Sequence, residues 1–388
     1  MKFDESSLYN IKSKLDGIRC SLYDLAIWKN GFAFKKIDFS ETGRPVIKIA
    51  ELNNGISSNT SFTQGNYSED VFIQWDDLLF SWSGNPKTSI DVFRYRLQDG
   101  WLNQHIFKVT ANEDLVTKDF LYYVLKFLKP HFTEIATNKQ TTGLGHVTIA
   151  DLKRMSLVVP LKEVQNQIVS ILKAIDDKIE VNKNINDNLQ QQAMALFDSW
   201  FISFDRTSGE VPADWTEGIL GDIATITSGK RPPMKRAVAT DGVQIPLVGA
   251  ASIMGFTNAV LYNEPILVTG RVGTHGVVQR FQTPCWTSDN TLVIKSPFYE
   301  FTYQVLQRVD YVNMNRGSTQ PLITQTDLKN VSIVLPPKTV LLEFEELAGS
   351  LMAMYEANRK ENDRLAALRD TLLPKLMSGE IDVSDIDL

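Results

Sequence analysis

Basic residues gather in one short stretch of the chain. Residues 230–236 read Lys-Arg-Pro-Pro-Met-Lys-Arg, directly after Ser228 and Gly229. This pattern predicts a loop that leaves a strand, and cations on such a loop can bind phosphate oxygens or the guanine edge in a major groove. A solvated surface loop without a ligand is the plain alternative. The candidate residues are Lys230, Arg231, Lys235 and Arg236.

Two further stretches combine a basic residue with glycines, hydroxyl groups or amide groups that suit close contact with a nucleic acid. Residues 269–276 read Thr-Gly-Arg-Val-Gly-Thr-His-Gly after an apolar run, and their glycines let the backbone approach another surface. Residues 316–320 join a cation to hydroxyl and amide groups, which bond phosphates and adenine. A tight hairpin and a strand-capping turn are the respective alternatives. The candidates are Arg271, His275, Arg316, Ser318, Thr319 and Gln320.

The first half of the chain holds a looser set of similar residues. A stretch after Gly31 supplies basic residues, and residues 81–87 take the place of the glycine-rich loop. Residues 141–146 stand where the second half has residues 317–322. Trp82 fits a core position as well as a ligand contact. The first-half candidates are Lys35, Lys36, Arg44, Trp82, Lys87, Thr141, Thr142 and His146.

Catalytic and metal-binding patterns are weak. Asp151-x-Lys153 and Asp327-x-Lys329 superficially resemble a nuclease motif, but both precede a predicted strand without a matching upstream acid, which favours a structural role. The sequence has no Asn/Asp-Pro-Pro-Tyr/Phe motif of adenine methyltransferases and no Gly-x4-Gly-Lys-Ser/Thr phosphate loop. Its four histidines and two cysteines are not at zinc-ligand spacing. We expect no catalytic residue, no metal and no cofactor on this chain.

The elements that must position these residues occur twice. Residues 151–201 align without a gap with residues 327–377, at an offset of 176 and with 14 identities in 51 positions. Upstream the halves match at drifting offsets of 198, 201, 185 and 181, as when shared strands are joined by loops of different length. The two copies therefore share a scaffold and present different loops.

The constant part of each copy has the pattern of a long helix. Seam positions alternate by four and three over more than four heptads, which indicates a coiled coil. Antiparallel packing is favoured because residues 203–337 connect the end of the first helix to the start of the second. It pairs Asn182 with Asn362 and Asn186 with Asn358, where buried asparagines fix the register; solvated interruptions of the seam are the alternative. Pro374 should kink or end the second helix near Asp370.

These patterns predict an α+β protein, with two similar globular α/β domains separated by a long antiparallel two-helix coiled coil in a pseudo-twofold tandem repeat. The first domain spans residues 1–160 and the first long helix 161–204. The second domain spans residues 205–337, and the second long helix with an acidic tail spans 338–388. Tyr122 and Tyr303 have helical spacing with apolar neighbours and should lie in the cores.

Composition narrows the class of protein. A chain of 388 residues, 43% hydrophobic and 22% charged, is typical of a soluble protein of two or three domains. We expect it to be cytoplasmic, without a signal peptide, membrane span or disulfide framework. The net charge of −6 argues against a nucleic-acid partner until it is divided along the chain. The acidic excess lies in residues 151–205 and 336–388, which leaves both globular parts close to neutral.

With these features the chain resembles the specificity (S) subunits of Type I restriction–modification systems over nearly its whole length. The likeness rests on the doubled unit and on the order and spacing of four local strings. The first half departs from the pattern, since it lacks the Pro-x-x-Trp that opens the second domain. The strings are Leu196–Phe201, Pro212–Trp215, residues 315–323 leading to Val334–Pro337, and Leu372–Ile381.

The resemblance implies two target-recognition domains, each reading one half of a split, asymmetric site in double-stranded DNA. It implies a non-catalytic subunit that recruits two methyltransferase subunits and restriction subunits, in systems of DNA methylation and host defence. S-adenosylmethionine is then expected on the methyltransferase partner, and ATP and Mg²⁺ on the restriction partner. A coiled-coil scaffold that binds proteins without reading DNA is the alternative, and the near-neutral charge of the globular domains keeps it open.

Overall fold

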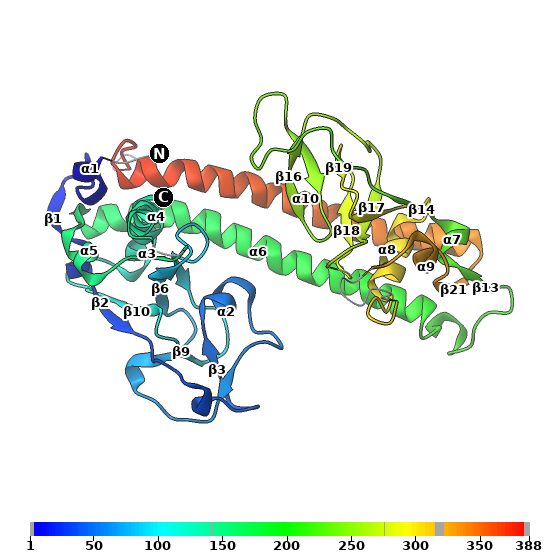
Figure 1. Ribbon diagram of the computed structural model, residues 1–388, viewed down its shortest axis with the longest axis horizontal. Coiled ribbons are helices and arrows are strands. Elements are labelled where there is room, and N and C mark those ends of the chain that lie inside the picture. The colour runs from blue at the N-terminus through cyan, green and yellow to red at the C-terminus, as the bar shows by residue number, and fades with distance from the viewer. Residues whose placement is uncertain (1–3, 141–142, 275, 315–321, 384–388) are drawn as a thin grey trace. The chain divides into compact units, whose positions relative to one another are not determined.

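A computed structural model describes residues 4–140, 143–274, 276–314 and 322–383. The chain forms two compact units, of which the first contains residues 1–180 and 362–388 and the second contains residues 181–361. Each unit combines a domain of strands and short helices with part of each of two long helices (Figure 1). No helix in the described part of the chain is long and apolar enough to cross a membrane.

A four-stranded antiparallel sheet forms the centre of the first unit, in the order β2-β10-β6-β8. Phe80 and Val109 of its middle strands are buried with Phe120 and Val124 of helix α3 in the main apolar core. The elements are β2 (Ala26–Asn30), β6 (Leu78–Ser81), β8 (Asp91–Arg94), β10 (Ile106–Ala111), α3 (Lys118–Phe127) and α4 (Lys129–Asn138).

A second, smaller sheet in the first unit has the order β4-β3-β9-β5. Ile47, Ile73 and Leu102 from its strands are buried in a separate small core with Tyr95. The elements are η2 (Lys36–Asp38), β3 (Arg44–Ile47), α2 (Ile49–Asn54), β4 (Phe62–Thr63), η3 (Glu69–Val71), β5 (Phe72–Ile73) and β9 (Gly100–Leu102).

Segments near the start and near the end of the described chain meet in the first unit beside the strand that leads into the first long helix. Strand β1 pairs antiparallel with β12, and the Lys14 N–H donates to the Ser378 carbonyl at 2.7 Å. Leu8 and Ile11 of the N-terminal segment are buried in the main core. The elements are α1 (Glu5–Tyr9), β1 (Gly17–Ser21), η1 (Leu22–Leu25), β7 (Ser83–Gly84), β11 (Gly145–His146), α5 (Ile149–Arg154) and β12 (Ser156–Pro160).

The second unit repeats this plan with connections of different length. A four-stranded sheet has the order β14-β20-β17-β18, a three-stranded sheet the order β16-β15-β19, and β13 pairs with β21. The elements are η4 (Asp205–Thr207), β13 (Thr216–Ile219), α7 (Leu220–Ile223), β14 (Thr225–Ser228), β15 (Ile245–Val248), β16 (Ile253–Thr257), β17 (Ile266–Gly270), β18 (Gln279–Phe281), β19 (Trp286–Thr287), β20 (Thr291–Lys295), α8 (Tyr299–Gln307), α9 (Gln325–Lys329) and β21 (Ser332–Leu335).

Equivalent residues of the two units have equivalent strand partners. Val46 lies opposite Trp101 in a parallel pair, and Leu247 lies opposite Trp286 in a parallel pair at the corresponding place. The pairs β1–β12 and β13–β21 also share one register. These matches confirm the tandem repeat and place the drift in offset within the connecting loops.

The two long helices are α6 (Lys162–Phe201) and α10 (Lys338–Met377). At about 1.5 Å per residue, their 40 residues correspond to about 60 Å each. Their contacts run antiparallel within each unit, since Asp176 bonds Arg369 in the first and Asn182 bonds Glu361 in the second. The seam positions are Ile168, Leu172, Ile175, Ile179, Asn182, Asn186, Leu189, Ala193, Leu196 and Trp200 in α6, and Phe344, Ala348, Leu351, Tyr355, Asn358, Asn362, Leu365, Arg369, Leu372 and Leu376 in α10.

The seam asparagines make hydrogen bonds between the helices. In the second unit Asn358 Nδ2 donates to Asn186 Oδ1 at 2.9 Å, which is the predicted pair, and Asn186 Nδ2 donates to the Tyr355 carbonyl at 3.2 Å. Asn182 bonds Glu361 at 2.7 Å. In the first unit Asn362 donates to the Ile179 carbonyl at 3.3 Å. Such bonds form at one alignment of the helices, because a slipped seam leaves buried amides without these partners.

Helix α10 differs from the prediction at its C-terminal end. It continues through Pro374 to Met377, so the expectation that it ends near Asp370 is wrong. Proline lacks the N–H that would donate to the residue four positions earlier, and its ring crowds that residue's carbonyl, so it disturbs one turn without having to end the helix. With one turn remaining, the helical bonding pattern resumes at once, since the Ser378 N–H donates to the Pro374 carbonyl at 3.0 Å.

An arginine joins sheet to helix in the same way in both units. Arg280 of β18 makes two hydrogen bonds of 2.6 Å to Glu300 of α8, and its guanidinium lies 4.7 Å from the Tyr303 ring centre. In the first unit Arg94 of β8 bonds Asp119 of α3 at 2.7 Å and lies 4.6 Å from the Tyr122 ring centre. Both tyrosines are half-buried against the cores, as predicted. Each ring also makes a cation–π contact with the arginine guanidinium.

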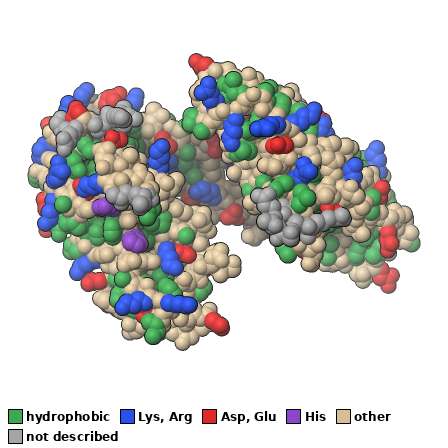
Figure 2. Space-filling view, viewed as in Figure 1, with side chains coloured by type: hydrophobic (Ala, Val, Ile, Leu, Met, Phe, Trp, Pro, Cys, Tyr) green, Lys and Arg blue, Asp and Glu red, His purple; other side chains and the backbone are tan. Residues whose placement is uncertain are grey.

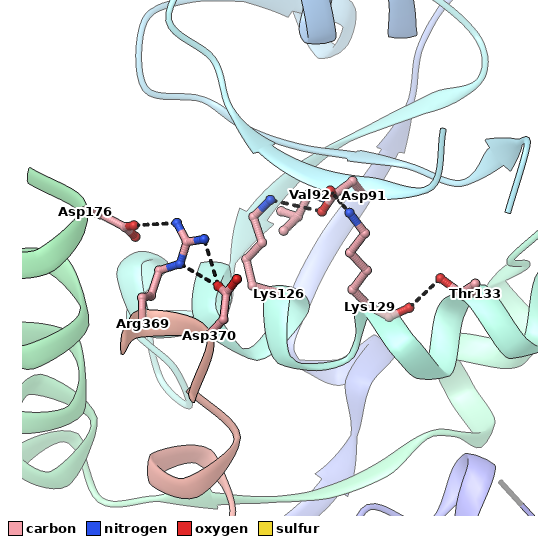
Figure 3. Close-up of polar contacts among 8 residues, drawn as sticks. All are labelled: Asp91, Val92, Lys126, Lys129, Thr133, Asp176, Arg369 and Asp370. Carbon is pink, nitrogen blue, oxygen red and sulfur yellow. Dashed lines mark hydrogen bonds and ion pairs between the residues drawn. The ribbon is translucent and has the colours of Figure 1, made fainter. Parts of the chain in front are cut away.

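Polar contacts also fix α3 and α4 of the first unit (Figure 3). Asp176 of α6 accepts from Tyr123 at 2.8 Å and from Arg369 of α10 at 2.9 Å, so one carboxylate joins three helices. Asp91 of β8 bonds Lys126 at 3.0 Å and also bonds Lys129. Burial raises the pKa of Asp91, but the two lysines outweigh it and hold this pKa below its usual range.

In the second unit a carboxylate of α10 binds the start of α8. Glu345 accepts the N–H groups of Glu300 at 3.0 Å and Phe301 at 2.8 Å. The first N–H groups of a helix have no partner within it, and the cap residue Phe298 supplies none. Burial raises the pKa of Glu345 to about 7, because it outweighs these two bonds.

This raised pKa makes a prediction about stability. Between the unfolded pKa near 4.5 and the folded value near 7, the folded protein holds a proton that the unfolded protein has released. Stability should therefore fall as the pH rises through this range, by on the order of 2 kcal/mol. Glu345→Gln should remove this component of the pH dependence.

The measurement is denaturant unfolding of the wild type and the variant at several pH values from 5 to 8, because their difference cancels all other titrating groups. A difference in unfolding free energy that stays constant with pH would contradict the assignment.

Candidate nucleic-acid interface

Backbone hydrogen bonds connect the basic loop, the glycine-rich loop and the chain from residue 322 onward in the second unit to one framework around β19. The Lys230 N–H donates to the Thr287 carbonyl at 2.9 Å, and the Arg271 N–H donates to the Asn290 carbonyl at 2.8 Å. The Ile323 N–H donates to the Arg271 carbonyl at 3.0 Å. The basic loop is thus attached to the end of β19 and the glycine-rich loop to the turn that follows it, and the chain that follows residue 321 is attached to the glycine-rich loop.

The first unit repeats these bonds at the corresponding residues. The Phe32 N–H donates to the Leu102 carbonyl at 2.8 Å, and the Trp82 N–H donates to the His105 carbonyl at 3.2 Å. The Val147 N–H donates to the Trp82 carbonyl at 2.8 Å. Because all of these partners are backbone groups, the loops can carry different side chains on the same framework.

Glycine is required where the basic loop leaves its strand. A Cβ on Gly229 would lie 2.1 Å from the Ser288 carbonyl oxygen, and one on Gly31 would lie 2.1 Å from the Asn103 carbonyl oxygen. No real side chain fits at that distance. Gly31 and Gly229 correspond in the repeat at the offset of 198, and both are therefore required by packing at the base of their loops.

The basic loop of the second unit is held at both ends and exposed between them. Trp286 Nε1 donates to the Lys230 carbonyl at 2.8 Å, and Arg236 forms a two-way backbone bridge with Phe256. Lys230, Arg231, Lys235 and Arg236 are all exposed. None of the four forms an ion pair with another residue in the described ranges, so their charges are available to an anion.

The corresponding loop of the first unit, which follows Gly31, has basic residues and aromatic side chains that pack on one another. Lys35 and Lys36 are exposed at the start of the one-turn helix η2. The rings of Phe34 and Phe39 stack at 6.3 Å within this loop. Arg44 is exposed, and its guanidinium lies 4.9 Å above the Phe72 ring.

The glycine-containing loop of the first unit has a packed tryptophan and exposed neighbours. Trp82 is half-buried, with its ring 5.7 Å from Phe107 and its Nε1 donating to Asn30 at 2.9 Å, so packing accounts for this residue. Lys87 is exposed. His146 is also exposed and is brought to this loop by the pairing of β11 with β7.

The remaining candidates are less informative. Arg271 is half-buried and bonded through its backbone. On the face shown in Figure 2, basic side chains lie in several separate places, with uncharged surface and acidic side chains between them. Seven candidates lie outside the described residues: Thr141, Thr142, His275, Arg316, Ser318, Thr319 and Gln320.

Two turns that anchor the loops were not predicted from the sequence. Residues 103–105 follow β9 and residues 288–290 follow β19, and both turns carry amide, imidazole, hydroxyl or carboxyl groups. His105 is exposed 5.6 Å from the Trp82 ring, and Asn290 is exposed beside Arg271. The matched pair Trp101 and Trp286 was the signal that could have located them.

The aspartates of the two Asp-x-Lys sequences cap short helices. Asp151 is buried, caps the start of α5 with Thr148, and bonds Lys139 through both oxygens at 2.6 Å. Asp327 makes the same cap with Thr324 at the start of α9. Among the residues of the described ranges, no three histidine, cysteine or acidic side chains are grouped to hold a metal ion.

The exposed basic loop supports a test by double substitution. Lys235→Ala with Arg236→Ala should weaken DNA binding at all sequences and lower the slope of log affinity against log salt by about 1 to 2, because the variant neutralises fewer phosphates and therefore releases fewer counterions on binding. Lys295→Ala is the matched control, because Lys295 pairs with Glu264 at 2.5 Å on the sheet.

Affinity would be measured at several salt concentrations with the partner subunits present. An unchanged slope in the double variant would remove this loop from the interface.

A protein-family model described as the Type I restriction modification DNA specificity domain matches the chain twice, over residues 20–191 and 212–340. The chain is 28% identical to the specificity subunit of the Type I restriction enzyme MjaIX of Methanocaldococcus jannaschii, over 72% of this chain and 73% of the relative. It is 24% identical to the HindI specificity subunit of Haemophilus influenzae, over 74% of this chain and 84% of the relative.

The fold also matches a solved structure. The crystal structure of the Type I restriction–modification S subunit from M. genitalium superposes with a TM-score of 0.55, at 17% identity, over 97% of this chain and 98% of that one. At this identity the match shows a shared fold and nothing more. The shared fold is a domain of strands and helices that occurs twice along the chain.

Proposed function

Because the chain belongs to the family of Type I restriction–modification specificity subunits and has two recognition domains, we propose that it reads a bipartite, asymmetric site in double-stranded DNA. Each domain reads one half of the site with its three bonded loops. The observation that carries the proposal is the repeated set of backbone bonds, which supports different side chains on one framework in the two units.

The charge distribution supports local rather than global attraction to DNA. Both globular parts are close to neutral, and the acidic excess lies in residues 151–205 and 336–388. The exposed cations of the basic loops therefore supply the phosphate contacts, and affinity without partners is modest.

We also propose that the chain performs no chemistry of its own. It recruits two methyltransferase subunits, which carry S-adenosylmethionine, and restriction subunits, which use ATP and Mg²⁺. The structural roles of Asp151 and Asp327 as helix caps agree with this division of labour. A scaffold that binds proteins without reading DNA is the competing function, and DNA binding without sequence preference in the presence of the methyltransferase partner would favour it.

The long helices set the spacing between the half-sites in this proposal. Each is a single helix of 40 residues, and the Asn186–Asn358 bond fixes one alignment of the two. A continuous helix transmits a change of length without absorbing it in a loop.

Exchange of one domain tests the assignment of half-sites. Replacing residues 206–335 with the corresponding domain of another family member should change one half of the methylated motif and leave the other half and the spacer unchanged. Sequencing of methylated DNA from cells that express the chimaera with its partners reads both halves at once. A change in both halves would contradict independent reading.

Insertion of one heptad into each helix tests the spacing. Seven residues add about 10 Å, which corresponds to at most about three base pairs of DNA. Insertions after Glu180 and Glu361 keep the heptad pattern, and the spacer of the methylated motif should lengthen while both half-sites stay the same. An unaltered spacer in an active variant would refute the role of the helices.

A further inference from the structure

The second unit has an open apolar groove that the recognition loops do not use. It lies between the end of α6, helix α8 and strand β21, and its volume is about 250 Å³. Its lining is mainly apolar, and the polar residues Arg308 and Ser332 also line it. The residues that form most of it are Phe201, Ile202, Phe301, Val305, Val309 and Ile333.

The first unit has the same groove, and there the chain fills it. Leu8 and Ile11 are only 4% and 5% exposed within the main core. The Ile11 N–H donates to the Ser156 carbonyl at 2.8 Å, and Asn10 pairs with Ser156 as a short parallel strand would. The N-terminal segment therefore adds a helical turn and a strand residue to the edge of β12.

The correspondence of the two grooves follows from the repeat. Ser156 corresponds to Ser332, and Ser378, which bonds Lys14, corresponds to Ile202, both at an offset of 176. The α3 wall corresponds to the α8 wall at an offset of 181, which relates Phe120 to Phe301. The groove in the second unit is thus the equivalent of an occupied peptide site.

No segment of the described chain takes this place in the second unit. The Ser332 carbonyl receives no N–H from outside the β13–β21 ladder among the described residues. Ile202 is 57% exposed at the mouth of the groove. The connection after α6 packs Trp215 against Phe201 and Phe204, with ring centres 5.7 Å apart in both pairs, and neither Phe204 nor Trp215 lines the groove.

We propose that this groove binds a segment of the methyltransferase partner that has the chemistry of residues 4–11. Such a segment has a capped helical turn, two aliphatic side chains three residues apart, and an N–H that donates to the Ser332 carbonyl. Addition of an extended segment to a free strand edge, with side chains in adjacent pockets, is a common mode of protein recognition. The proposal rests on the proposed function, because it assigns the surface to the partner named there.

A second copy of this chain is the less favourable occupant. Its own N-terminal segment would have to leave the first unit, which exposes Leu8 and Ile11 and empties one groove to fill another. The exchange buries no additional apolar surface. A partner segment fills the groove without that loss.

The first test uses a charge at the mouth of the groove. Ile202→Asp should weaken binding of the methyltransferase subunit to the full chain at least tenfold, because a carboxylate there opposes the burial of aliphatic side chains. Val260→Asp is the matched control, since Val260 is 47% exposed in the same unit and does not line the groove. With saturating methyltransferase, the variant should methylate the same motif as the wild type.

The second test uses the occupant of the first groove as a probe. A labelled peptide of residues 4–16 should bind the full wild-type chain, compete with the methyltransferase subunit, and lose binding to the Ile202→Asp variant. The same peptide with Ile11→Asp should not bind. The competition and the Ile11→Asp peptide control do not depend on how the variant chain tolerates its substitution, because both are measured on the wild-type chain.

Two results would overturn the proposal. If Ile202→Asp leaves methyltransferase binding unchanged and the peptide does not compete, the groove is not the partner's site. If the peptide binds without competing while the chain forms concentration-dependent oligomers that Ile202→Asp abolishes, the occupant is a second copy. Failure of the wild type to bind any methyltransferase subunit would instead contradict the proposed function itself.

Discussion

The rest of the structure depends on the backbone bonds that attach the loops to the end of β9 or β19 and to the turn that follows each strand. These bonds join the same positions in both units. Phe32 in the first unit and Lys230 in the second are bonded to the end of the strand, and Trp82 and Arg271 are bonded to the turn after it. Backbone groups are common to all residues, so this attachment does not restrict side-chain identity. The glycine at the base of each basic loop is the exception, because the carbonyl of the turn leaves no room for a Cβ. Loops fixed in this way can differ in sequence and still present their side chains from a rigid support.

The constant elements are held by a different kind of contact. Carboxylates on the long helices bond the neighbouring helices, as Asp176 does for Tyr123 and Arg369, and Glu345 does for the start of α8. A missing partner would leave these groups unsatisfied where they are partly buried, so they specify position as well as adding stability. The acidic excess of the chain is concentrated in these helical regions. The net charge therefore reflects the scaffold and says little about the loops.

The sequence was sufficient for the architecture because two signals were long. The gapless 176-residue offset and the seam of alternating fours and threes each extend over many turns, and together they predicted the repeat, the helices and their antiparallel contacts. Short signals were less reliable, since Pro374 lies too near the end of α10 to stop it. Trp82 packs against Phe107, as one of its two interpretations predicted, and its contact with DNA stays a prediction. The anchoring turns and the apolar groove were not predictable, because both depend on segments that meet only through strand pairing. The part played by each loop residue at DNA stays a prediction.

The central claim is that one chain reads two different half-sites at a fixed separation. Genome-wide mapping of methylated bases in cells that hold this chain with its partner subunits, compared with cells that lack it, tests this most directly. The account predicts one asymmetric motif of two short specified parts separated by a gap of constant length and no sequence preference. A continuous or palindromic motif, or methylation that does not depend on this chain, would contradict it.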